Sequence, residues 1–107
     1  MAHRITKDVE DKVRAYMDTL ARDIHVSAVY VFGSQAKGEA RPDSDIDVAI
    51  VSPSFGRDAF ATGSYLQKKL WDSPYKNMDV VGYSPDDFSA EDSPLITEIK
   101  AHGVMVV

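Results

Sequence analysis

The sequence contains no cysteine. That absence excludes disulfide bonds, zinc sites with thiolate ligands and a cysteine nucleophile, and it fits the reducing cytoplasm, where we expect the chain to be found. No run of residues approaches the ~18 apolar positions of a membrane-spanning helix. Residues 1–7 also lack the apolar segment of a signal peptide. We therefore expect no contact with a membrane.

Basic residues are too few to balance the acidic ones. The 12 Lys and Arg residues face 17 Asp and Glu residues, which gives a net charge of −5. A chain without a basic surface is a poor ligand for phosphate backbones, so direct binding of nucleic acid is not expected. The length of 107 residues, with 44% hydrophobic and 27% charged residues, is that of one globular domain spanning residues 1–107.

The hydrophobic pattern predicts alternating helices and strands. Apolar residues recur at helical spacing after Thr6, which can cap a helix ending near Asp23. Further helices are expected over residues 57–71 and 95–101, with a turn or helix start at 84–87. Four apolar runs read as strands: residues 26–32, 45–51, 77–83 and 104–107. We therefore expect an α/β (α+β) domain in which helices pack on one side of a small mixed sheet of about four strands.

Two aspartates open the second predicted strand. Asp45 and Asp47 are two positions apart, so their side chains leave the same face of a strand, about 6.5–7 Å apart along the chain. A turn at Gly33 and Ser34 ends the strand before it, and Ser34 can cap a short helical turn that leaves backbone N–H groups free. Such a turn beside paired carboxylates suits a nucleoside triphosphate with magnesium. A tight turn without any function is the alternative.

A third carboxylate, Asp79, lies within the predicted strand 77–83 and is its only acidic residue. An acidic residue there is unfavourable for strand formation and burial unless something compensates its charge. Three converging carboxylates would repel one another without a bound dication. We therefore expect two Mg²⁺ ions, one activating a hydroxyl nucleophile and the other steadying the leaving pyrophosphate.

These motifs resemble the nucleotidyltransferase superfamily that includes DNA polymerase β and the kanamycin nucleotidyltransferase. The shared pattern is Gly-Ser, ten residues, Asp-x-Asp and a later acidic residue, represented here by Gly33-Ser34, Asp45-Ile46-Asp47 and Asp79. The string from Gly33 to Asp47 looks like the minimal nucleotidyltransferases of bacteria and archaea. The resemblance covers nearly the whole chain and implies the fold of that superfamily.

The resemblance also implies residue roles. Asp45, Asp47 and Asp79 would be the catalytic, metal-binding residues, and Gly33 and Ser34 would hold the phosphates of ATP. Three further polar residues are candidates for nucleotide contacts: Lys37, Arg41 and Ser44. For the two basic residues the alternative is ordinary solvation, and Ser44 can instead shape the loop.

The family implies a reaction and a partner. Its members are often antitoxins paired with a HEPN-domain ribonuclease toxin, which implies transfer of AMP from ATP to a hydroxyl, notably a tyrosine, of that toxin. We expect no room for an acceptor domain in this chain, so the acceptor would come from another protein. Two alternatives stay open: a non-catalytic module that binds nucleotide or metal and neutralises its partner by occlusion, and a transferase acting on RNA ends or a small molecule.

Overall fold

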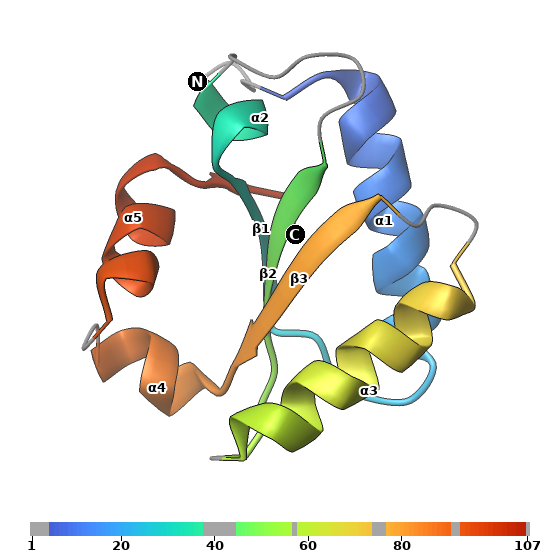
Figure 1. Ribbon diagram of the computed structural model, residues 1–107, viewed down its shortest axis with the longest axis vertical. Coiled ribbons are helices and arrows are strands. Elements are labelled where there is room, and N and C mark those ends of the chain that lie inside the picture. Colours follow the sequence, from blue (N-terminus) through green and yellow to red (C-terminus); the bar gives the residue numbers. More distant parts are fainter. Residues whose placement is uncertain (1–4, 38–44, 57, 74–76, 91–92, 107) are drawn as a thin grey trace.

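The fold alternates short helices and strands around one sheet (Figure 1). The computed structural model describes residues 5–37, 45–56, 58–73, 77–90 and 93–106. In chain order the elements are α1 (Lys7–Ala21), β1 (Ala28–Phe32), α2 (Ser34–Lys37), β2 (Ile46–Val51), α3 (Ala59–Trp71), β3 (Met78–Tyr83), α4 (Pro85–Ala90), α5 (Pro94–His102) and β4 (Val104–Met105). None of the helices in these ranges has the length and apolar character needed to cross a membrane.

The sheet has the strand order β3-β2-β1-β4. Strand β1 pairs antiparallel with β2 and β4, whereas β2 and β3 run parallel. The expected α+β domain with a mixed sheet of four strands is thereby confirmed. The parallel pair has a direct consequence for the acidic residues, because its register sets Asp47 opposite Asp79.

Helices cover both faces of the sheet rather than one, which corrects our expectation. Ile46, Val48 and Ile50 of β2 join the hydrophobic core beneath α1 and α3. Ala49 and Val51 point the other way and join a second cluster with α4 and α5. Figure 1 shows the two helix pairs on opposite sides of the strands. A central strand buried on both faces needs apolar residues at every position, as residues 48–51 provide.

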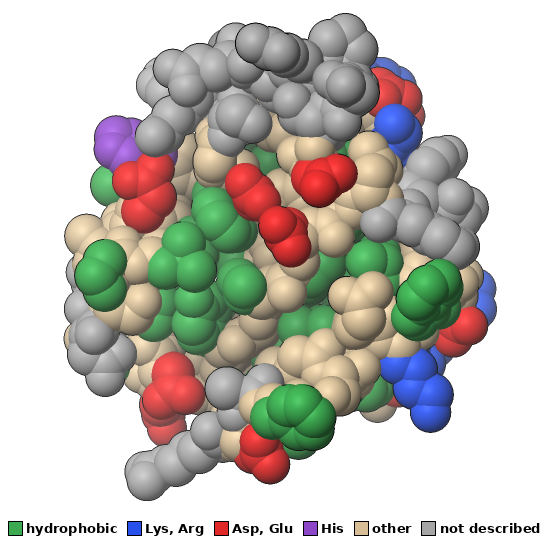
Figure 2. Space-filling model, in the orientation of Figure 1, with side chains coloured by type: hydrophobic (Ala, Val, Ile, Leu, Met, Phe, Trp, Pro, Cys, Tyr) green, Lys and Arg blue, Asp and Glu red, His purple; other side chains and the backbone are tan. Residues whose placement is uncertain are grey.

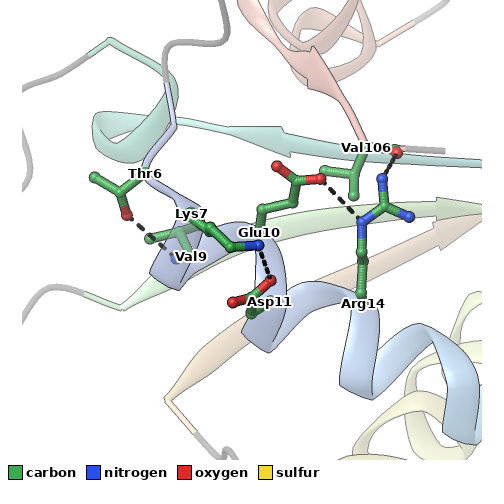
Figure 3. A network of polar contacts seen from close by, with 7 residues as sticks. All are labelled: Thr6, Lys7, Val9, Glu10, Asp11, Arg14 and Val106. Carbon is green, nitrogen blue, oxygen red and sulfur yellow. Dashed lines mark hydrogen bonds and ion pairs between the residues drawn. The ribbon is translucent and has the colours of Figure 1, made fainter.

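Helix α1 begins as the sequence predicted and anchors the end of the chain (Figure 3). The Thr6 hydroxyl accepts a hydrogen bond from the backbone N–H of Val9 at 3.2 Å, which satisfies one of the free amides of the first turn. Further along, Arg14 donates to Glu10 at 2.9 Å and to the backbone carbonyl of Val106 at 3.1 Å. One side chain therefore links α1 to the segment after β4.

Two contacts join α1 and the residues after it to α3. The buried Tyr16 hydroxyl donates to the carbonyl of Leu66 at 2.8 Å. Burial raises the pKa of Tyr16 well above its usual range, so the hydroxyl stays protonated. Asp23, just beyond α1, forms an ion pair with Lys69. These contacts hold the two helices of one face in a fixed relation.

Candidate active site

The acidic pair stands where β2 begins. Asp45 directly precedes the strand and is exposed, and Asp47 is its second residue and half-buried. Ile46, between them, is 1% exposed and belongs to the core beneath α1 and α3. The alternation expected of a half-buried strand thus anchors the apolar residue and turns Asp47 to the opposite face.

Strand β3 brings the third carboxylate to the same place. Asp79 is the register partner of Asp47, and neighbouring strands lie only about 4.8 Å apart. Partners in a parallel pair project from the same face of the sheet. Figure 2 shows acidic side chains gathered over the upper ends of β2 and β3. The structure therefore brings together the three carboxylates that the sequence singled out.

The surroundings of Asp47 shift the pKa of its side chain away from the ordinary value of an aspartate. Partial burial raises the pKa of its carboxyl group, and the neighbouring carboxylates of Asp79 and Asp45 raise it further. Each of these causes disfavours the ionised form, so a negative charge is held at Asp47 only at a cost in free energy. A bound cation would remove that cost. The ionised carboxylate of Asp47 is thus energetically unfavourable at the position that is predicted to bind a metal ion.

The ligand atoms available here are carboxylate oxygens, which suit magnesium. Among the described residues, however, no three or more His, Asp or Glu side chains are gathered tightly enough to enclose an ion on their own. Magnesium keeps waters and takes phosphate oxygens of a substrate as further ligands. Asp45, Asp47 and Asp79 therefore fit magnesium in chemistry and charge, as an open set of ligands rather than a closed cage.

The glycine turn before α2 packs directly on Asp47. Gly33 has a φ of +72°, a conformation that other residues rarely adopt. A Cβ atom at this position would collide with the carboxylate of Asp47. The positive φ therefore favours glycine, and a side chain at this position would displace the carboxylate of Asp47. The sequence predicted the turn but not this contact, since no local signal reports a neighbour fourteen positions away.

The remaining predicted site residues are placed less completely. Ser34 begins α2 and Lys37 ends it, and for both residues the structure describes the backbone alone. Arg41 and Ser44 lie outside the described residues. The roles suggested for these four side chains therefore remain predictions.

Beyond Asp79, strand β3 carries two half-buried residues that the sequence had not singled out. Val81 and Tyr83 follow Asp79 at alternate positions and pack against the cluster of α4 and α5. The Tyr83 ring lies 5.9 Å from that of Phe88, and burial raises the pKa of Tyr83. The alternation of side chains along β3 could have indicated that Val81 and Tyr83 share a face with Asp79. It places an apolar strip beside the carboxylates.

Two hollows bordered by described residues lie away from the carboxylates. One of about 350 Å³ is bordered by Ile24, Phe55 and Tyr65, and another of about 370 Å³ by Pro53, Phe55 and Ser84. Both adjoin the end of β2 opposite to Asp45 and Asp47. The carboxylates line neither of them.

Comparison with known proteins gives one match by sequence family. A family model described as a nucleotidyltransferase domain matches residues 10–103. No curated protein sequence matches significantly.

Comparison with solved structures gives a clear likeness of fold. A toxin–antitoxin crystallised with AMP-PNP aligns over 92% of this chain and 72% of its own, with 24% identity and a TM-score of 0.61. A protein from Sulfolobus solfataricus, provisionally assigned as a nucleotidyltransferase, aligns over 94% and 86%, with 17% identity and a TM-score of 0.59. The toxin–antitoxin MntA-HpeT, in a mutant with two aspartates changed to glutamate, aligns over 92% and 71%, with 22% identity and a TM-score of 0.57.

Proposed function

The chain belongs to the nucleotidyltransferase domain family, and we propose that it transfers AMP from ATP to a hydroxyl group of a partner toxin, whose antitoxin it is. The observation that carries this proposal is the meeting of three carboxylates on two neighbouring strands beside a glycine turn. Structures of similar fold support the toxin and the nucleotide, since they include toxin–antitoxins and one crystallised with AMP-PNP. We take the setting to be the cytoplasm.

Residue roles follow from position in the site. Asp45 and Asp47 bind magnesium, and Asp79 completes the set of ligands. Gly33 lies against the carboxylate of Asp47, and the backbone of Gly33 and Ser34 holds the phosphates of ATP. In the MntA-HpeT mutant the altered aspartates are two positions apart, as Asp45 and Asp47 are. Magnesium, when bound, neutralises the phosphates and stabilises the charge that develops on the leaving group.

The chemical step is a transfer of the α-phosphoryl group with its adenosine. The hydroxyl oxygen of the acceptor forms a bond to the α-phosphorus, and the bond from that phosphorus to the oxygen bridging to the β-phosphate breaks. Pyrophosphate leaves, and the acceptor carries AMP. Asp79 is exposed at the rim of the site, and its carboxylate accepts the hydroxyl proton directly or through one water.

The partner is a HEPN-type ribonuclease toxin, and the acceptor is one of its tyrosines. Both points rest on the sequence resemblance and refine the family assignment. A tyrosine hydroxyl fits the charge of the site, because it approaches three carboxylates without a negative charge of its own. Neutralisation by occlusion, with no transfer, is the alternative outcome of the test below.

The test measures the mass of the partner. The protein is incubated with ATP, Mg²⁺ and the product of the adjacent gene, and the product is then weighed by intact mass spectrometry. We expect a mass gain of one or more AMP units with the wild type and none with Asp45→Asn/Asp47→Asn. The matched control Asp18→Asn/Asp86→Asn removes two charges from exposed positions on α1 and α4 and should leave the gain intact.

The decisive contrary result is neutralisation without modification. If the Asp45→Asn/Asp47→Asn variant still blocks the toxin and the partner mass never changes, the protein acts by occlusion. The enzyme proposal is then wrong.

A further inference from the structure

Strand β3 forms one edge of the sheet, since the strand order is β3-β2-β1-β4. Among the described residues no strand pairs with its outer side. Figure 1 shows β3 in front of the other strands, with α3 to one side and α4 and α5 to the other. The view runs along the shortest dimension, 21 Å, so this edge opens onto the broad face of 33 by 30 Å. The outer edge of β3 therefore faces outward on the largest surface of the molecule.

The backbone of β3 has hydrogen-bonding groups that β2 does not use. The carbonyl of Asn77 accepts from the amide of Ile46 at 3.0 Å, and the carbonyl of Tyr83 accepts from the amide of Ser52 at 3.0 Å. In a strand the bonding direction alternates from one residue to the next, so odd-numbered residues of β3 face β2. The residues whose N–H and C=O groups point outward are Met78, Val80 and Gly82.

Within Met78–Tyr83 this edge has few of the features that usually prevent pairing with another chain. Protected edges are short, carry charged residues, prolines or bulges, or are covered by a helix or loop. Strand β3 has six residues and no proline, and its only charged side chain is Asp79. The opposite edge, β4, has only two residues. The unprotected edge is thus the one that carries a site carboxylate.

We propose that the acceptor protein adds an extended segment to the outer edge of β3, and that a side chain of this segment presents its hydroxyl to the carboxylates. The proposal rests on the proposed function and says how the acceptor is bound. Outward N–H and C=O groups at alternate residues match the hydrogen-bonding pattern of an extended polypeptide, which can add a strand to a sheet edge.

The register makes Asp79 the meeting point. Because the backbone of Asp79 bonds to β2, an added antiparallel strand would oppose it with a residue in a non-hydrogen-bonded pair. In such pairs the Cα atoms are about 4.5 Å apart and the side chains lie closest. The acceptor residue opposite Asp79 then projects from the sheet face that also carries Asp47. Its hydroxyl can therefore lie next to the carboxylates without any rearrangement of the sheet.

Apolar side chains flank this edge on the broad face. Val81 and Tyr83 form a half-buried strip on the side of α4 and α5. On the other side α3 exposes Phe60 and Trp71, which are 83% and 66% accessible. Figure 2 shows hydrophobic side chains on both sides of the strand. A folded protein that supplies the extended segment can cover both, whereas a free peptide covers the edge alone.

A second copy of this chain is a poorer occupant. Antiparallel pairing of two β3 edges around Val80 would bring the two Asp79 side chains, and the acidic sites behind them, close together. Each chain also carries a net charge of −5. Like charges at this distance repel, so the geometry favours a different protein.

Amide exchange tests the pairing directly. Exchange rates of Val80 and Gly82 are measured by NMR in the free protein and in its complex with the product of the adjacent gene. In the free protein these outward amides should exchange faster than those of Asp79 and Val81, which bond to β2. In the complex they should slow by at least about tenfold. If their rates do not change while AMP is transferred, the edge pairing is wrong and the proposed function stands.

A backbone substitution provides the second test. Replacing the Val80 peptide bond with an ester removes the outward N–H and keeps the side chain. We expect the Kd of the complex to rise about 2- to 10-fold, which corresponds to the net contribution of one lost hydrogen bond. The matched control is the same ester at Met105 on the opposite sheet edge, where Val106 bonds to Val29 and Met105 points outward. Equal effects at both positions, or no effect at Val80, overturn the pairing.

The two failures can be told apart in the same samples by the mass of the partner. Transfer of AMP together with unprotected Val80 and Gly82 overturns only the edge pairing. Absence of any mass gain with the wild type overturns the proposed function, and the acceptor site inferred from it falls as well. A β3 edge protected by self-association, seen as a dimer without the partner, also counts against the proposal.

Discussion

The negative charge of Asp47 lowers the stability of the folded protein. The pKa of Asp47 is raised in the folded protein, by burial and then by Asp79 and Asp45. Its contribution to stability is therefore fully present below the ordinary pKa of an aspartate and is lost as the pH rises through the folded value. At neutral pH the ionised group destabilises the fold. The position is kept acidic at the expense of the fold, as expected of a residue selected for binding.

The first prediction concerns Asp47→Asn in the absence of divalent ions. Because the substitution removes a disfavoured charge, Tm at pH 7 should rise above that of the wild type. The difference should shrink toward zero near pH 3, where the carboxyl group is protonated in both folded and unfolded chains. Scanning calorimetry across this pH range measures it. A Tm that falls at pH 7 would show that Asp47 is stabilised by its surroundings, contrary to the argument.

The second prediction concerns Gly33→Ala. A side chain here meets the Asp47 carboxylate, and the positive φ is unfavourable by about 1–2 kcal/mol for a non-glycine residue. We expect a loss of roughly 1–3 kcal/mol in the free energy of unfolding and loss of AMP transfer. Urea denaturation and the mass assay measure the two effects.

Gly63→Ala is the matched control for that substitution. Gly63 lies in α3, where an added Cβ would meet nothing within 4 Å. Alanine should raise stability there by roughly 0.5–1 kcal/mol through its helix propensity, with transfer unchanged. Equal losses at Gly33 and Gly63 would mean that neither space nor conformation distinguishes the two positions.

At the residue scale, the sequence was enough to select candidate site residues but not to predict which residues surround them. Alternation along one strand was enough to expect Asp45 and Asp47 on the same face. That Asp79 lies beside them depends on the register of β2 with β3. The contact between Gly33 and Asp47 depends on the fold of β1 against β2, because the register sets Phe32 opposite Asp47. That pairing is a long-range property, which local patterns do not encode.

At the scale of elements, α1 and α3 act as one unit through a buried hydrogen bond. Tyr16 has no exposed surface, and its hydroxyl reaches the carbonyl of Leu66. The bond spans fifty positions in the chain, so it forms only when both helices are docked. Its strength reports on docking rather than on either helix alone.

The third prediction follows from this bond. Tyr16→Phe keeps the ring and removes the hydroxyl, and should lower the free energy of unfolding by about 1 kcal/mol. The carbonyl of Leu66 keeps its place in α3, so no larger penalty is expected. Urea denaturation measures the change, and the m-value should stay constant. A loss beyond about 3 kcal/mol would mean that the hydroxyl supports more than this one bond.

Element positions were predictable to within a few residues, but their arrangement was not. Thr6 and Ser93 cap helices in the structure, and Thr6 was recognised from its position before an apolar stripe. The expectation that all helices lie on one face was incorrect because α4 and α5 bury few residues, chiefly Phe88, Ile96 and Ile99. A few buried apolar residues indicate that a helix packs against the sheet, but they do not indicate which face of the sheet the helix covers.

At the scale of the whole molecule, strand order decides how the site meets its surroundings. The sequence indicated four strands, but only the pairings reveal that β2 is central and β3 is at an edge. Order in a sheet depends on which connection crosses over, and several orders are compatible with the same local patterns. Candidate site residues could therefore be proposed from the sequence, whereas the position of β3 at an edge of the sheet could not.

Asp47 and Asp79 differ in the kind of strand that holds them. Strand β2 is paired on both sides, so freeing Asp47 requires breaking two ladders at once, close to global unfolding. Among the described residues, strand β3 pairs with β2 alone, so its local opening can release Asp79 while the rest of the sheet persists. Local opening at Asp79 therefore costs less free energy than local opening at Asp47. A strand added to β3 by a partner would raise the free energy of that local opening and so hold Asp79 in place.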